Sequence, residues 1–221
     1  MSAVAHGGQS YSVELARKGI HLFSLSIPVI YYFISKSTAL KILIPLTSLF
    51  LLVEIARFVH PTTNSLFHRL LGWLLRPHES DSTAKRLTGA TYVLLSAVIC
   101  IWLFPKLIAV TAFAILIISD TSAALVGRRF GKRPFLKKSL EGSLAFLVSA
   151  LVVVLVSPKI VFHPLEYLIG GTAAVVGTVA ESLANAVDDN LLVPLTVGAT
   201  MWVLYILLLP HVNVFALDGP N

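Results

Sequence analysis

Seven apolar runs, each long enough or nearly long enough to cross a bilayer, constrain this chain more than any other feature. A transmembrane helix needs about 17–25 mostly apolar residues. Of the 221 residues, 56% are hydrophobic and only 13% are charged, so no polar stretch could form a separate soluble domain. We therefore expect an all-α integral membrane protein, with residues 1–221 as one polytopic domain. The runs cover residues 19–35, 39–59, 89–104, 106–126, 142–157, 165–187 and 190–209.

The third and fourth apolar runs are almost continuous. Only Pro105 and Lys106 separate them, so the pair forms either a helical hairpin or one broken span. The N-terminal residues lack an early cationic patch followed by an apolar run and a cleavage site. We therefore expect no cleaved signal peptide.

Basic residues lie mostly on one side of the predicted membrane domain. If seven spans alternate, thirteen Lys and Arg residues share the face of the N-terminus, and four lie opposite. Because cytoplasmic loops are enriched in Lys and Arg, the N-terminus should be cytoplasmic and the C-terminus should lie outside. The cytoplasmic set is Arg17, Lys18, Arg57, Arg69, Arg76, Lys85, Arg86, Arg128, Arg129, Lys132, Arg133, Lys137 and Lys138.

The long polar connection between the second and third runs contains one amphipathic segment. Over about 62–77, Leu66, Leu70, Trp73 and Leu74 fall on one helical stripe. Such a helix lies in the membrane interface. Either a surface anchor or a part of the substrate-access route agrees with this pattern.

Several ionisable or amide side chains lie where the apolar runs approach the cytoplasmic face. An ionisable group inside a spanning helix is costly and is therefore a candidate functional group. Carboxylates at one depth can hold a hard divalent cation such as Mg²⁺, usually together with substrate phosphates. The residues are Glu54, Arg57, Asp120, Glu181, Asn185, Asp188, Asp189 and Asn190.

The predicted basic cytoplasmic loop, 127–140, follows Asp120 closely in the sequence. Lysine and arginine neutralise phosphates, and a helix N-terminus such as the one Ser139 would cap also binds them. The segment "GRRFGKR" is not a Walker A motif, because the glycine spacing is one residue too short and no Ser or Thr follows the lysine.

Each of these charged features also has a purely structural interpretation. The basic loop could bind anionic lipids or fix the orientation of the chain. Asp120 could form a structural ion pair, and Glu54 and Arg57, three residues apart, could pair within one helix. Near the N-terminus, Arg17 and His21 share a helical face at the entrance of the first run.

Four segments together resemble the family of CTP-dependent lipid kinases, which includes dolichol, phytol and farnesol kinases and a CTP-using diacylglycerol kinase. The segments are "ELARKGIHL", "LTGATYVLLS", "SDTSAALVGRRFGKRPFLKKSLEGSLAF" and "VAESLANAVDDNLLVPL". The resemblance implies phosphoryl transfer from a nucleoside triphosphate, typically CTP, to a lipid hydroxyl. The short chain is most similar to phytol-kinase-like and bacterial or plastid members.

The resemblance places the nucleotide near the block from Asp120 to Gly142, and together with the charge pattern it leads to a hypothesis for individual residues. We expect Asp120 and Asp189, with Glu181, to hold Mg²⁺, although Asp120 or Glu181 could instead be the catalytic base. Secondary candidates are Arg17, His21, Glu54, Arg57, Asn185, Asp188 and Asn190. The nucleotide should contact Gly127, Arg128, Arg129, Gly131, Lys132, Lys138, Ser139, Glu141 and Gly142.

The expected reaction joins a membrane lipid alcohol and a nucleoside triphosphate at the cytoplasmic or stromal interface. The acceptor would be phytol, farnesol or a polyprenol such as dolichol, and the choice among CTP, UTP and ATP stays open. Diacylglycerol kinase, CDP-diacylglycerol-type cytidylyltransferase and anionic-solute transporter are the alternatives, in that order. We expect no nucleic-acid partner, and a homo-oligomer stays open.

The charge pattern makes a prediction about topology. A cysteine introduced as Arg133→Cys should react with a membrane-impermeant maleimide only from the cytoplasmic side, because residue 133 lies in the basic loop. Lys159→Cys, on the opposite face, is the matched control and should react only from outside. Labelling of both positions from the same side would contradict the predicted orientation.

Overall fold

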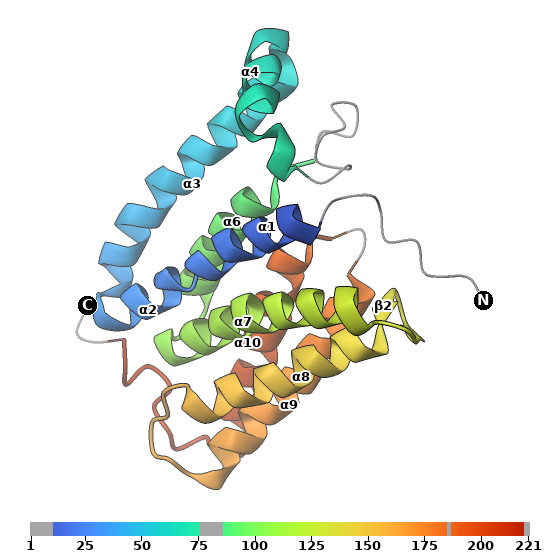
Figure 1. Cartoon of the computed structure of the whole chain (residues 1–221). Coiled ribbons are helices and arrows are strands. Elements are labelled where there is room, and N and C mark those ends of the chain that lie inside the picture. Colours follow the sequence, from blue (N-terminus) through green and yellow to red (C-terminus); the bar gives the residue numbers. More distant parts are fainter. Residues whose placement is uncertain (1–10, 76–85, 185–186, 219–221) are drawn as a thin grey trace.

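The computed structural model describes residues 11–75, 86–184 and 187–218, and it is almost entirely helical (Figure 1). The all-α fold class is therefore confirmed; a short ribbon of β1 (Pro134–Phe135) and β2 (Lys138–Ser139) interrupts the helices. The helices are α1 Tyr11–Phe23, α2 Ser26–Phe33, α3 Lys36–Val59, α4 Pro61–Leu71, the 3₁₀ helix η1 Gly72–Leu74, α6 Gly89–Leu103, α7 Lys106–Phe130, α8 Leu140–Val156, α9 Pro164–Leu183 and α10 Asp189–Leu208.

Helix α7 is the centre of the bundle. In its most apolar 18-residue window, 72% of the residues are buried, against 22% in α3 and 33% in α10. It packs against α1, α2, α8 and α10, and Ile108, Ile115 and Leu116 are fully buried. A helix that is apolar on all sides belongs in the interior. Since Asp120 lies on this helix, the most buried element carries the first candidate carboxylate.

Three described helices, α3, α7 and α10, are long and apolar enough to cross a membrane, and α6 and α8 are shorter apolar helices. Together with the composition, these helices indicate a membrane protein. Phe104 and Pro105 separate α6 from α7, so the third and fourth predicted runs form two distinct helices.

The first predicted span, 19–35, is not a single helix, which corrects the sequence-based assignment. The chain turns at Ser24 and Leu25, whose backbone N–H groups donate to carbonyl oxygens three residues earlier. Helix α1 instead begins at Tyr11 and is amphipathic, with buried Glu14 and Lys18 on one face. Its polar face therefore lies against the protein, and not along a lipid-facing span.

The amphipathic segment predicted over 62–77 is helical as far as Leu74. Helix α4 and η1 cover Pro61–Leu74, and residues 76 and 77 lie outside the described ranges. Leu66, Leu70 and Trp73 are 56%, 62% and 58% exposed, as expected for the apolar stripe of an interfacial helix.

Small residues allow α9 to pack closely against α8 and α10. Ala173 and Ala174 are fully buried, and a Cβ atom at Gly177 would lie 2.6 Å from a methyl group of Val197. Small side chains on α9 thus permit the close helix packing that is typical of helices in lipid.

At the end of the bundle opposite the basic segment, one buried carboxylate organises the loop between α8 and α9. Glu166, only 1% exposed, accepts hydrogen bonds from the N–H groups of Ile160 and Val161, at 2.9 and 3.1 Å. The hydroxyl of Tyr205 on α10 donates to the same carboxylate at 3.0 Å. This network ties the loop to two helices.

The network predicts a stability change on removal of one hydroxyl. Tyr205→Phe should lower the thermal unfolding midpoint of the detergent-purified protein, because a buried hydrogen bond to a charged acceptor contributes about 1.5–3 kcal/mol. Tyr32→Phe is the matched control, since Tyr32 is 40% exposed. Equal midpoints for the two variants would show that the Tyr205 hydroxyl does not stabilise the loop.

Candidate functional site

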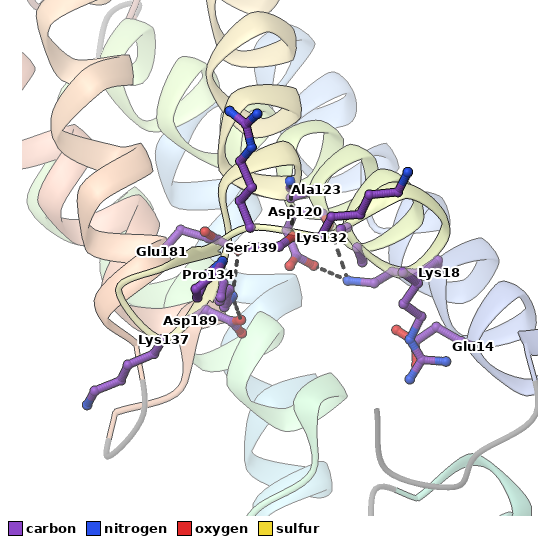
Figure 2. Close-up of a pocket in the computed structure, with 17 residues that line it drawn as sticks. Glu14, Lys18, Asp120, Ala123, Lys132, Pro134, Lys137, Ser139, Glu181 and Asp189 are labelled. Atoms are coloured by element: carbon purple, nitrogen blue, oxygen red, sulfur yellow. Dashed lines mark hydrogen bonds and ion pairs between the residues drawn. The ribbon is translucent and has the colours of Figure 1, made fainter. Parts of the chain in front are cut away.

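A pocket of about 350 Å³ lies where the ends of several helices meet the β1–β2 hairpin (Figure 2). Its charged lining comes from α1, α7, the hairpin segment 131–139, α9 and α10. Six of these side chains are basic and four are acidic, so the lining has a formal charge of +2. They are Glu14, Lys18, Asp120, Arg128, Lys132, Arg133, Lys137, Lys138, Glu181 and Asp189.

The basic segment folds back as a hairpin between α7 and α8. Pro134 pairs with Ser139 and Phe135 with Lys138, while Leu136 at the tip has a positive φ of 51°. Helix α7 extends to residue 130, so the first residues of the predicted loop 127–140 are helical.

Glu141 braces this hairpin and lies outside the lining of the pocket. Its carboxylate accepts hydrogen bonds from the backbone N–H groups of Lys132, at 3.0 Å, and Arg133, at 3.3 Å. Next to it, the Ser139 hydroxyl caps α8 by accepting the N–H of Gly142 at 3.2 Å. Glu141, expected at the nucleotide, thus has a structural role in the hairpin.

Glycine is required where the hairpin leaves α7. A Cβ atom at Gly131 would lie 2.2 Å from the carbonyl oxygen of Gly127 and 2.8 Å from the Ser139 hydroxyl oxygen. The first contact is with backbone, which cannot move aside like a flexible side chain. The glycine therefore allows the chain to turn back over the end of α7.

Asp120, 6% exposed, is paired with α1 on one side of the pocket. The Lys18 ammonium lies 2.5 Å from Asp120 Oδ2 and 3.4 Å from the Asp120 carbonyl oxygen. His21 Nε2 lies 3.4 Å from the same carboxylate oxygen. Figure 2 shows Lys18 pointing from α1 toward Asp120. The structure thus brings the secondary candidate His21 to the main site.

Glu14 connects α1 to the end of α7. Its carboxylate lies 2.9 Å from Arg17 and 3.3 Å from Arg128, and the residue is 4% exposed. Sequence reasoning missed Glu14 and Lys18 as site residues. The available signal was their spacing: positions 14, 18 and 21 share one face of a helix.

Lys138 bridges two carboxylates on the other side of the pocket. Its ammonium lies 2.5 Å from Glu181 Oε1 on α9 and 3.1 Å from Asp189 Oδ2 on α10. Burial disfavours the charged ammonium, but the carboxylates of Asp189, Glu181 and Asp120 outweigh this effect and raise the pKa of Lys138 above its ordinary value. Lys138 is therefore a cation at neutral pH.

The carboxylates suit a metal ion that is shared with a substrate. Among the described residues, no group of three or more His, Cys, Asp or Glu side chains could hold a metal ion by itself. Glu181 and Asp189 nevertheless converge on one cationic group from two helices. Mg²⁺ commonly takes one or two carboxylates together with substrate phosphates, so this donor set fits such an arrangement.

Arg129 and the Glu54–Arg57 pair lie outside the pocket lining. Arg129 is exposed, with its guanidinium 5.3 Å from the centre of the Phe130 ring. Arg57 Nε lies 2.5 Å from Glu54 Oε2, and both residues are buried. Glu54 also accepts from Thr88 N–H at 2.9 Å, so this pair joins α3 to the start of α6.

Two of the remaining secondary candidates, Asp188 and Asn190, flank Asp189 at the start of α10. Asp188 caps the helix by accepting the N–H of Asn190 at 3.0 Å and its side-chain amide at 2.7 Å. Asn190 is 5% exposed. Asn185 lies outside the described residues. Asp188 and Asn190 therefore set the geometry next to Asp189 without lining the pocket.

Comparison with known proteins finds three partial similarities. The chain is 27% identical over 190 residues to an uncharacterised protein of Rickettsia prowazekii, covering 85% of this chain and 93% of that protein. It is 27% identical over 168 residues to CTP-dependent diacylglycerol kinase 1 of Schizosaccharomyces pombe, covering 68% of this chain and 74% of the kinase. It is 30% identical over 140 residues to dolichol kinase sec59 of the same yeast, covering 57% of this chain and 26% of the kinase.

No family model matches the chain, and no solved structure matches it. The two yeast similarities support the resemblance to lipid kinases at the level of the family. Neither of them singles out a phytol-kinase-like member.

The hairpin geometry predicts a position-specific cost for an added methyl group. Gly131→Ala should lower the thermal unfolding midpoint in detergent, because the new Cβ would collide with the Gly127 carbonyl. Gly19→Ala is the matched control: nothing lies within 4 Å of its added Cβ, and alanine is the better helix former. A Gly131→Ala midpoint as high as that of the control would contradict the described turn.

Proposed function

We propose that this protein is a lipid kinase that transfers a phosphoryl group from a nucleoside triphosphate, CTP by preference, to the hydroxyl of an isoprenoid alcohol. The alcohol would be phytol, farnesol or a polyprenol such as dolichol, and the reaction would take place at the cytoplasmic face of the membrane. The observation that carries the proposal is a net cationic pocket, with buried carboxylates, at the ends of apolar helices.

The charge of the pocket supports a polyphosphate ligand. A nucleoside triphosphate carries several negative charges, and a lining of formal charge +2 attracts it. Arg128, Lys132 and Lys138 are the predicted phosphate ligands that line the pocket, and Lys18 joins them from α1. Cations placed around a transferring phosphoryl group stabilise the charge of its transition state.

The position of α1 supports an acceptor that stays in the lipid. Glu14 and Lys18 line the pocket, whereas Leu15, Ile20 and Phe23 on the same helix are 51%, 52% and 80% exposed. A single helix thus has the charged pocket on one side and exposed apolar residues on the other. A hydroxyl group on a membrane-dissolved chain would have a short path to the phosphates.

The proposed reaction uses one carboxylate to accept a proton. The oxygen of the lipid alcohol attacks the terminal phosphorus, its proton passes to Asp120 or Glu181, and the bond to the bridging oxygen breaks to release the nucleoside diphosphate. Mg²⁺, when bound with the nucleotide, would neutralise charge on the phosphates. Asp189, with whichever of Glu181 and Asp120 does not accept the proton, would supply its protein ligands.

The donor and acceptor rest on different observations. CTP is proposed because one similar yeast protein is described as a CTP-dependent kinase. The two similar yeast kinases are named after diacylglycerol and dolichol, so both lipid classes are included as acceptors in the activity assay. An isoprenoid alcohol is proposed because the short chain resembles phytol-kinase-like members.

The proposal predicts a specific product. Detergent-purified protein with Mg²⁺ and CTP should phosphorylate phytol, farnesol or a polyprenol, measured by thin-layer chromatography or mass spectrometry of the lipid fraction; UTP, ATP and diacylglycerol complete the panel. Asp120→Asn keeps the shape of the side chain but removes its charge, and turnover should fall at least about 100-fold. Its thermal unfolding midpoint reports whether the fold is kept.

Two outcomes would count against this function. Absence of any phosphorylated lipid with every donor and acceptor pair would oppose the kinase. Undiminished activity of a folded Asp120→Asn variant would mean that the reacting groups lie elsewhere. Phosphorylation of diacylglycerol alone would replace the proposed acceptor but keep the reaction.

A further inference from the structure

Lys138 lies at the position where two carboxylates from different helices converge. Its ammonium contacts Glu181 Oε1 at 2.5 Å and Asp189 Oδ2 at 3.1 Å. Glu181 is 2% exposed, so its charge has little help from solvent. A buried carboxylate needs a cation or a proton, and here the protein supplies the cation itself.

We infer that Lys138 is an exchangeable internal counter-ion, which excludes a divalent cation from Glu181 and Asp189 until nucleotide phosphates draw the lysine away. This inference rests on the proposed function. An ammonium group and a divalent cation cannot share the same carboxylate oxygens, because like charges at this distance repel strongly. In the nucleotide-free protein, Lys138 thus neutralises the two carboxylates without a metal ion. The metal ion binds only together with the nucleotide.

The structure places Lys138 where it can move. It lies in β2, one of the two-residue strands of the hairpin, and its side chain is 31% exposed. Lys18, the counter-ion of Asp120, lies instead on helix α1 with a side chain only 5% exposed. Lys138 can therefore leave its carboxylates without the unpacking of a helix, whereas Lys18 is held in place.

The phosphates provide the new partner that this exchange requires. Lys138 lines the same pocket as Lys132 and Arg128, so a triphosphate bound in this pocket would lie close to Lys138. The Lys138 charge then passes from carboxylate to phosphate, and the carboxylates become free for the cation that accompanies the nucleotide. Lys138 and the two carboxylates therefore each keep an opposite charge nearby during the exchange.

The inference predicts a gain of metal binding when a lysine is removed. Lys138→Met keeps an unbranched stem but no charge, so Glu181 and Asp189 should bind Mn²⁺ without nucleotide at least about tenfold more tightly than in the wild type. Free Mn²⁺ in a titration of the full-length protein in detergent is measured by electron paramagnetic resonance. Adding Asp189→Asn to Lys138→Met should remove the gain.

Lys137→Met is the matched control on the same hairpin. Figure 2 shows the Lys137 side chain directed away from Glu181 and Asp189. Its removal should leave the affinity for Mn²⁺ alone near that of the wild type. A similar gain in both variants would point to a general charge effect and would overturn the role assigned to Lys138.

The wild type provides a test that needs no substitution. In equilibrium dialysis it should retain little Mn²⁺ alone, and at least about ten times more with a non-hydrolysable CTP analogue. Tight binding of Mn²⁺ alone by the wild type, or an unchanged affinity in a folded Lys138→Met variant, would overturn the inference. Neither measurement uses lipid phosphorylation, so failure of the proposed reaction would be seen separately.

Discussion

The pocket depends on ion pairs that join elements distant in the sequence. Lys18 and Asp120 join α1 to α7, and Lys138 joins the hairpin to α9 and α10 through Glu181 and Asp189. Removal of one partner from a buried pair leaves an uncompensated charge, which typically costs about 3–5 kcal/mol. The same contacts therefore hold the helix ends together and fix the positions of the charged groups.

The acidic and basic groups of the pocket lie largely on different kinds of element. Asp120 stands on α7, the most buried of the three long apolar helices, and Glu181 stands on the small-residue helix α9. The basic groups opposite them lie largely on a hairpin with two-residue strands. In the proposed reaction, the helices would keep the carboxylates oriented while the cations of the hairpin contact the phosphates.

Much of the candidate site could be predicted from charged residues that lie near the ends of apolar runs. Asp120, Glu181 and Asp189 are acids at the ends of apolar runs, and the structure brings them to one pocket with Lys138. A common depth was predicted for them because the three acids lie near the predicted cytoplasmic ends of their apolar runs. Glu14 was missed because a carboxylate before the first apolar run has the appearance of a solvent-exposed residue, and only the packing of α1 buries it.

Other expectations depended on contacts that no linear pattern contains. Gly131 lines the pocket and also permits the turn at the end of α7, whereas Glu141 lies outside the lining and braces the hairpin. Arg129 follows Arg128 directly, but the helix turns by about 100° per residue, so their side chains leave α7 in different directions. Arg128 lines the pocket and Arg129 is exposed.

The sequence by itself determined the helical class, the membrane character and the region where charge gathers, because hydropathy and charge act over whole segments. Only the tertiary structure decided which acid pairs with which lysine, and that the first apolar run breaks into α1 and α2. Those outcomes depend on distances of a few ångströms between residues up to 102 positions apart, which segment-averaged properties do not specify.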